Sequence, residues 1–306
     1  LHYPLRRQRQ MCIRDSGISY DNFSRTSKPT NHKITQEIFL ILLNNGFILK
    51  KKVLLPYCNI DRKFLPDRWI EGTCPHCGYR PARGDQCADS CGRLLDPSDL
   101  IDPYCVICKI KPIFKEVEHL FLDLPKLQKQ LEKWIKANKH WKTNVRNLAL
   151  GWIKEGLQPR SISRDLTWGI SIPLQGFQDK IFYCWFDAPI CYISSTVEWA
   201  EAAGKPEEWR KYWQSKETKI VHFIGKDNIV FHAIIWPTIL IGTGEFNLPY
   251  QVAGLEFLNY EGDKISKSRN WGIFLDVVGS EAKVKVGDKA VDIEPDLLRF
   301  YLALIM

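Results

Sequence analysis

The chain has 306 residues, of which 45% are hydrophobic and 25% charged, and its formal net charge is +8. This composition is typical of a globular protein of about two domains, and it excludes a disordered tail protein, a collagen-like chain and a short disulfide-stapled peptide. No apolar run reaches the roughly 18–20 residues that a transmembrane helix needs. We therefore expect no membrane partner, and the modest positive charge is compatible with nucleic acid or phosphate ligands.

The two ends of the chain differ in pattern from the rest. Residues 1–17 are basic and lack both apolar periodicity and the apolar segment of a signal peptide. We interpret them as a non-native segment and leave them out of the fold prediction. At the other end, Pro295 opens a helical run that reaches Met306 while its apolar face still needs a partner. We therefore expect the chain to be a fragment.

Hydrophobic periodicity predicts helices and strands along most of the chain. In chain order these are a helix over residues 34–43, a helix over 124–137, a strand over 180–186, a strand over 220–224 and a helix over 230–240. Gly46 provides the residue that often caps a helix, and the basic run Lys50–Lys52 is typical of an exposed turn after one. The strand, glycine turn and helix after residue 220 indicate a βα unit of a parallel sheet.

Cysteines predict a metal site within residues 56–115, a segment rich in Cys, Pro, Asp and Gly. Six of the ten cysteines form three pairs: Cys74 with Cys77, Cys87 with Cys91, and Cys105 with Cys108. A structural Zn²⁺ ion takes four such ligands, so the middle pair can close a site with either the first or the third pair. A second ion would then need ligands of another kind, such as His76. We interpret the remaining four cysteines as free thiols: Cys12, Cys58, Cys184 and Cys191.

A polar loop, Lys264-Ile265-Ser266-Lys267-Ser268, carries two ammonium groups and two hydroxyls. Such a loop can hold a polyphosphate and neutralise the charge that develops on a leaving pyrophosphate. Here the chain resembles the methionyl-tRNA synthetase family of class I aminoacyl-tRNA synthetases, whose signature loop is Lys-Met-Ser-Lys-Ser. The resemblance extends from about residue 20 to residue 306 and rests on further stretches: residues 64–68, 84–87, 119–124, 163–165, 182–189 and 223–228, with His232.

The resemblance implies an α/β fold, namely a partial Rossmann-like parallel-sheet catalytic domain interrupted by a zinc-binding connective insertion. Its implied parts are the end of the first catalytic half (18–55), the insertion (56–165) with zinc knuckles at 74–108, the second catalytic half (166–258), and the signature loop with the start of the stem-contact region (259–306).

The resemblance also implies site residues, each carried over to a matching position. Those implied to bind methionine are Trp185, Tyr192, Asp227 and His232; those implied to bind ATP are Gly225, Asp227, Asn228, Lys264, Ser266, Lys267 and Ser268; those implied to be catalytic are Lys264, Lys267 and Arg164. Without the family, Trp185 is typical of an ordinary core residue, Asp227 of a helix N-cap, and Arg164 of an exposed salt bridge.

The activity that the resemblance implies is ligation of methionine to tRNA(Met) through methionyl-adenylate, with ATP and Mg²⁺, in the cytoplasm. The family's His-Ile-Gly-His signature does not occur in the sequence, and neither does its anticodon-binding domain. We therefore expect little activity from the chain alone. Further departures are Ile265 for methionine, Cys191 where glycine is usual, and the extra residue between Cys87 and Cys91.

Two other functions fit parts of the sequence. One is a non-catalytic derivative of a synthetase that uses the zinc-organised insertion and the basic residues 126–146 to bind RNA or a protein. The other is a class I synthetase for leucine or isoleucine. The short insertion disfavours the second alternative, because those enzymes carry a large editing domain there, and the aromatic residues Trp185 and Tyr192 suit a thioether better.

Overall fold

The computed structural model describes residues 19–66, 68–84, 87, 90–91, 93, 95–265, 270–272, 283–292 and 294–305. These residues fall into two compact units. The first unit comprises Asn31–Lys126 and Gln158–Ile190, and the second comprises the described parts of Leu1–Thr30, Leu127–Leu157 and Cys191–Met306. The domain boundaries expected from the sequence remain predictions.

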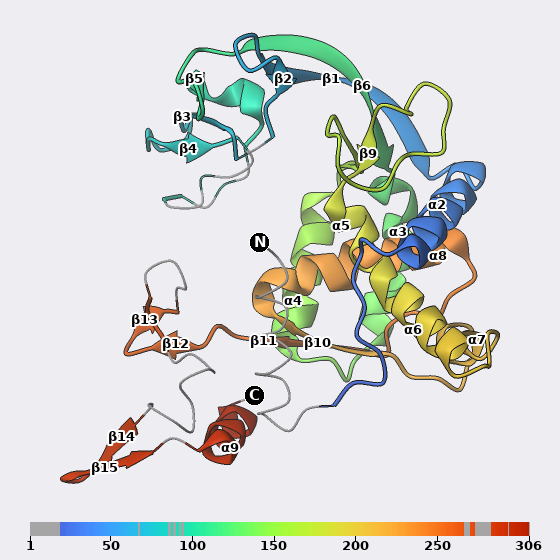
Figure 1. The fold of residues 1–306 in the computed structure, drawn as a ribbon, viewed down its shortest axis with the longest axis vertical. Coiled ribbons are helices and arrows are strands. Elements are labelled where there is room, and N and C mark those ends of the chain that lie inside the picture. Colours follow the sequence, from blue (N-terminus) through green and yellow to red (C-terminus); the bar gives the residue numbers. More distant parts are fainter. Residues whose placement is uncertain are drawn as a thin grey trace. The chain divides into compact units, whose positions relative to one another are not determined.

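Figure 1 labels the elements in chain order. The helices are α2 (Pro29–Asn44), α3 (Leu124–Ala137), α4 (Thr143–Glu155), α5 (Cys184–Asp187), α6 (Ile190–Ala202), α7 (Trp209–Trp213), α8 (Trp236–Thr243) and α9 (Pro295–Ile305). The longer strands are β1 (Ile48–Cys58), β3 (Ile70–Thr73), β5 (Ile101–Cys105), β6 (Ile113–Leu122), β10 (Val221–Gly225), β11 (Gln251–Leu255), β14 (Lys283–Val286) and β15 (Lys289–Asp292). The two-residue strands are β2 (Lys63–Phe64), β4 (Ala82–Arg83), β7 (Arg160–Ser161), β8 (Ser163–Arg164), β9 (Ile181–Phe182), β12 (Asn259–Tyr260) and β13 (Asp263–Lys264).

The first unit is built on a long antiparallel ribbon of β1 and β6, which runs from the pair Ile48 and Leu122 to the pair Tyr57 and Ile113 (Figure 1). Strands β2 and β7 extend it to a four-stranded sheet in the order β2-β1-β6-β7. The prediction of a turn at Lys50–Lys52 is wrong, because these residues lie in β1. Their partners are remote in sequence: the Lys52 ammonium lies 2.9 Å from the carboxylate of Glu116 on β6.

A cysteine-rich module lies between β1 and β6 in the chain, with its own three-stranded sheet in the order β4-β3-β5. Its core is a cluster of eight buried residues, of which four are cysteines: Cys58, Leu65, Ile70, Cys74, Ala82, Cys87, Leu100 and Cys105. A core this small rarely holds a fold together without disulfides or a metal. Every cysteine in the described part of the chain is a free thiol, so a bound metal fits the role of the stabilising cross-link better than a disulfide.

The second unit contains a parallel pair of strands, in which Val221 of β10 lies opposite Gln251 of β11 and Gly225 opposite Leu255. Between them the chain forms a π-helical turn over Phe231–Ile235 that continues into α8. Nearly all of α8 is buried, and this apolar helix returns the chain to the neighbouring strand. The βα unit expected after residue 220 is therefore confirmed, and the fold is of the mixed α/β class.

Most of the other predicted elements agree with the structure. The helices expected over 34–43 and 124–137 are α2 and α3, and Pro295 opens α9. The strand expected over 180–186 is wrong after Phe182, because α5 begins at Cys184. Phe182 and Phe186 are both buried, and their rings stack. Two buried residues four positions apart lie on one face of a helix and also on one face of a strand, so their spacing does not distinguish the two. No helix in the described part of the chain is long and apolar enough to span a bilayer.

Candidate active site and metal centres

Four thiols of the cysteine module converge on one point. The Sγ atoms of Cys74, Cys77, Cys87 and Cys91 all lie within 4.8 Å of one another. The Cys74–Cys91 separation is 3.9 Å and the Cys77–Cys87 separation is 3.7 Å. A tetrahedral zinc with Zn–S bonds of about 2.3 Å has S–S edges of about 3.8 Å. The geometry therefore fits a four-thiolate zinc site, and it favours pairing of the first two cysteine pairs.

The electrostatics of this group favour at least one thiolate. A backbone hydrogen bond from Tyr79 and a side-chain contact with Ser90 lower the pKa of Cys77 to about 6. Burial in the module core raises the pKa of Cys87 to about 12. Without a cation, four thiolates cannot share this space, because each one destabilises the charge of the next.

A second group contains Cys58, Asp61, Cys105 and Cys108, whose ligand atoms also lie within 4.8 Å of one another. The Sγ atoms of Cys58 and Cys108 are 3.4 Å apart, and Asp61 Oδ2 lies 3.0 Å from the Cys58 sulfur. The Asp61 backbone N–H donates to the same sulfur at 3.3 Å, which is the contact that stabilises a thiolate in a knuckle. Three thiols and a carboxylate are a donor set that zinc accepts.

This second group corrects the sequence interpretation at two points. Cys58, interpreted as a thiol outside the metal site, lies in the group and is 2% exposed. His76, suggested as a ligand of a second ion, instead has its Nδ1 3.3 Å from the guanidinium of Arg93. The signal that the sequence offered was the spacing Cys58-x-x-Asp61, which equals that of a CxxC knuckle with a carboxylate in place of the second thiol.

A cluster of aromatic and imidazole rings lies in the second unit. The Tyr192 ring, on α6, has its centroid 5.3 Å from that of His222 and 5.9 Å from that of His232. The Trp236 ring lies 6.4 Å from Tyr192, edge to face. Of the residues predicted to enclose a methionine side chain, Tyr192 and His232 are thus brought together. His222 and Trp236 were missed, although the i, i+4 spacing of His232 and Trp236 places them on one helix face.

The hydrogen bonds of His232 fix its tautomer. Its Nδ1 lies 3.0 Å from the carbonyl oxygen of Asn228, which can only accept, so Nδ1 carries a proton. Burial lowers the pKa of His232, so the ring is neutral and Nε2 is an acceptor. The Tyr192 hydroxyl lies 2.9 Å from Nε2 and donates to it. Burial and the neighbouring His232 also lower the pKa of His222 to about 4, so the cluster is uncharged at neutral pH.

The turn after β10 positions Asp227. Gly225 ends the strand, and Lys226–Asn228 form a short 3₁₀ turn that exposes Asp227 and Asn228. A Cβ on Gly225 would lie 2.8 Å from Asp227 Oδ1, so the close approach of this carboxylate to the strand end requires glycine. Ligands of parallel sheets bind at this carboxyl end of the strands. The ribose-contacting role expected of Asp227 stays a prediction.

The flanks of the Lys264–Ser268 loop form a tight hairpin. Tyr260 lies opposite Asp263, and the turn residues Glu261 and Gly262 have φ of 50° and 85°, as a two-residue hairpin turn of this kind requires. Trp271 Nε1 donates to the carbonyl of Tyr260 at 3.1 Å and so joins the two ends of the loop. The backbone of Lys264 lies in β13. Its side chain and Ser266, Lys267 and Ser268 lie outside the described residues.

Arg164 and Trp185 belong to the first unit. The Arg164 guanidinium lies over the Tyr183 ring, 3.8 Å from its centroid, and Nη1 donates to Ser161 Oγ and to the Ser163 carbonyl, each at 2.8 Å. The side chain is therefore held by a ring and two acceptors, and no acidic partner is among these contacts. Trp185 is 45% exposed, so it is not an ordinary core residue.

Comparison with known proteins shows a close match along the whole chain. A family model described as class I (M) tRNA synthetases matches residues 4–306. The chain is 46% identical over 303 residues to a methionine–tRNA ligase of Pyrococcus furiosus, covering 94% of this chain and 40% of that protein. It is 45% identical over 290 residues to the enzyme of that name from Thermoplasma volcanium, covering 95% and 51%. The chain thus spans about half the length of the curated relatives that it matches.

The fold is also similar to a solved structure. The methionyl-tRNA synthetase of Mycobacterium tuberculosis in complex with methionyl-adenylate superposes with a TM-score of 0.56 at 25% identity, over 85% of this chain and 44% of that one.

Proposed function

This chain belongs to the class I (M) family of tRNA synthetases, and from that premise we propose that it forms part of the catalytic region of a methionine–tRNA ligase. The protein that contains it would activate methionine with ATP to methionyl-adenylate, release diphosphate, and transfer the methionyl group to tRNA(Met). Support comes from curated relatives of that name at 45–46% identity.

The observation that carries this proposal is the neutral ring cluster around Tyr192. A thioether is apolar and polarizable, and it makes favourable contacts with aromatic rings. Tyr192, His222 and His232 form such a cluster without a charge, and the buried Trp236 packs behind Tyr192. Tyr192 is itself 40% exposed, so one side of the cluster is open to a ligand. We assign methionine binding to Tyr192 and His232 here, with Trp185 and Asp227 as further contacts.

We propose that ATP binds at the end of β10. The turn Gly225, Asp227 and Asn228 would contact the nucleoside, and the loop residues Lys264, Ser266, Lys267 and Ser268 would contact the phosphates. Lys264, Lys267 and Arg164 are the residues that we expect to stabilise the charge on the departing diphosphate. Mg²⁺ would enter with ATP and neutralise its phosphates.

We further propose that both metal groups of the cysteine module hold structural zinc. Four protein donors in each group leave no open position for a substrate, so neither ion would take part in the chemistry. The ions would add to the stability that the small core of the module provides. Free thiols throughout the described chain suit a reducing compartment, and we expect the protein to act in the cytoplasm.

The proposal is tested by Tyr192→Phe in the full-length product of this gene, assayed by methionine-dependent ATP–diphosphate exchange. Loss of the hydroxyl leaves the buried Nε2 of His232 without its donor, and such a loss costs about 1–3 kcal/mol. We expect KM for methionine to rise about 10-fold, with kcat changed much less.

The matched control is Tyr212→Phe, because Tyr212 is an exposed tyrosine of the same unit whose ring contacts Trp199. This variant should keep the wild-type KM. Equal KM values for Tyr192→Phe and wild type would contradict the proposed methionine site.

A further inference from the structure

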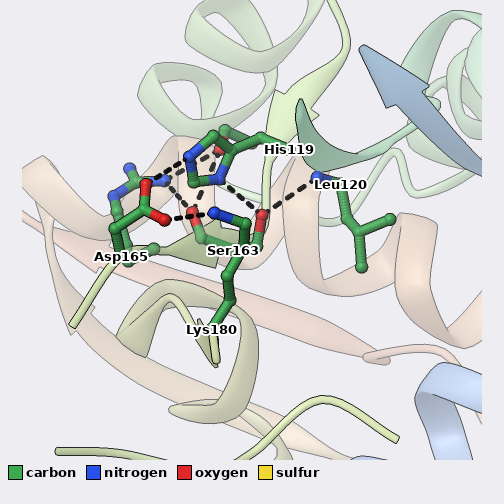
Figure 2. A network of polar contacts seen from close by, with 7 residues as sticks. His119, Leu120, Ser163, Asp165 and Lys180 are labelled. Carbon is green, nitrogen blue, oxygen red and sulfur yellow. Dashed lines mark hydrogen bonds and ion pairs between the residues drawn. The ribbon is translucent and has the colours of Figure 1, made fainter. Parts of the chain in front are cut away.

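A second polar network lies in the first unit, and it joins three strand segments (Figure 2). His119 comes from β6, Ser163 from β8, Asp165 directly follows β8, and Lys180 directly precedes β9. His119 Nδ1 lies 2.7 Å from Ser163 Oγ, and Nε2 lies 2.8 Å from Asp165 Oδ2. Lys180 Nζ donates to Asp165 Oδ1. His119, Ser163 and Lys180 are all buried.

One set of donor directions gives each hydrogen bond of this network a donor and an acceptor. Ser163 Oγ accepts from the Leu120 backbone N–H at 2.9 Å, and the acceptor within reach of its own buried proton is His119 Nδ1. Burial acts to raise the pKa of Asp165, but hydrogen bonds from His119 and Lys180 outweigh it and hold the pKa below its ordinary value. The ionised carboxylate can only accept, so His119 carries its proton on Nε2. Each donor of these hydrogen bonds then has an acceptor.

The arrangement contains a serine, a histidine and an aspartate, but it is not that of a nucleophile. Ser163 has no exposed surface, and its Oγ already accepts from a backbone N–H. A serine nucleophile must reach its substrate and pass its proton to a base that can then move it onward. Here the proton path ends at a carboxylate that is neutralised by a buried ammonium. The network therefore holds atoms in place.

What it holds is the backbone on both sides of Arg164. Ser163 and Asp165 are the direct neighbours of that residue, and each is tied to β6 or to the start of β9 through side-chain bonds. The guanidinium in turn bonds the Ser163 carbonyl and lies over Tyr183, which follows β9. A shift of β8 against β9 would therefore move the guanidinium directly.

We propose that His119, Ser163, Asp165 and Lys180 are positioning residues that fix the guanidinium of Arg164 for adenylate formation. The proposal rests on the proposed function, because the role of Arg164 does. The four side chains touch no substrate; they act through the geometry of β8. A misplacement of about 1 Å of a reacting group costs about 10²-fold in rate. A network that fixes the backbone on both sides of Arg164 can therefore control kcat without touching the substrate.

The test is a double-mutant cycle in the full-length product of this gene, read by methionine-dependent ATP–diphosphate exchange. Asp165→Asn keeps the shape but places an N–H against His119 or Lys180, and it should lower kcat about 10²-fold with little change in KM for methionine. In an Arg164→Ala background, the same substitution should cause no further loss, because the residue that it positions is gone. Ser171→Ala, at an exposed serine of the same unit, is the matched control.

The outcomes separate the two proposals. Wild-type protein without methionine-dependent exchange refutes the proposed function itself. If the wild-type protein is active and the fold-losses of Asp165→Asn and Arg164→Ala multiply in the double variant, the positioning role is refuted. The network would then act independently of Arg164. If Asp165→Asn does not fold, the imidazole ¹⁵N shifts of His119 in the wild-type chain remain decisive: the Nε2–H tautomer is expected, and an Nδ1–H tautomer would overturn the proposal.

Discussion

Cys74→Ser is expected to reduce the zinc content of the purified chain from two ions to one and to destabilise the cysteine module. Half of the buried core cluster of this module is cysteine, so the fold has little apolar surface left without the metal. Structural zinc contributes an apparent binding free energy of about 10–16 kcal/mol, which is also folding free energy. Metal analysis by mass spectrometry and circular dichroism of the same samples measure the two effects.

The second metal group provides an internal comparison. Asp61→Ala leaves the four thiols of the first group in place and removes one donor of the second, so it should release the second ion first under a chelator. Cys184→Ser is the matched control, because Cys184 is exposed on α5 and belongs to neither group. This account of the module would be contradicted if the metal-free protein unfolded cooperatively and with the same stability as the zinc-treated protein.

Gly225→Ala is expected to lower the rate of methionine-dependent exchange about 10²-fold while leaving the melting temperature nearly unchanged. The added Cβ would lie 2.8 Å from Asp227 Oδ1. The exposed Asp227 side chain would rotate away to relieve this contact, since it moves more easily than the backbone. The fold loses little, because Asp227 is exposed. Its carboxylate, however, leaves the position that we assign to substrate binding. Exchange kinetics and a thermal melt of the full-length protein measure the two effects separately.

Two other glycines show whether the effect is specific. Gly151, inside α4, has no atom within 4 Å of an added Cβ, so Gly151→Ala should leave the activity unchanged and stabilise the fold by about 0.5–1 kcal/mol, because alanine favours a helix over glycine. Gly254 is the opposite case: its Cβ would meet Ile229 at 2.8 Å and Val145 at 3.0 Å, so Gly254→Ala should destabilise the fold by about 1–3 kcal/mol. Full activity of Gly225→Ala would exclude Asp227 from the reaction.

Local patterns in the sequence predicted the parts of the fold that depend on neighbours in the chain. The cap at Gly46, the helix that Pro295 opens and the paired cysteines all act within a few residues, so their spacing alone indicates the structure. The strand expected over 180–186 failed at Cys184 because a short run of buried aromatic residues suits both a strand and a helix.

Contacts between residues far apart in the sequence could not be predicted from local patterns. Cys58 lies 50 residues from Cys108, and only the pairing of β1 with β6 brings the two together. His119 and Ser163 are 44 residues apart and meet because β6 and β8 belong to neighbouring parts of one unit. Asp61 could have been predicted as a metal ligand, because its spacing from Cys58 is that of a zinc knuckle. The pattern of paired thiols does not include it, because its ligand atom is a carboxylate oxygen.

The central claim is that the protein containing this chain activates methionine. The measurement that tests it most directly is ATP–diphosphate exchange by the full-length product of this gene with methionine, leucine and isoleucine in parallel. We predict exchange with methionine and a kcat/KM lower by at least about 10²-fold for the β-branched isoleucine, because a pocket shaped for an unbranched thioether excludes branching near the backbone. Equal rates with all three amino acids, or exchange with leucine or isoleucine alone, would contradict the account.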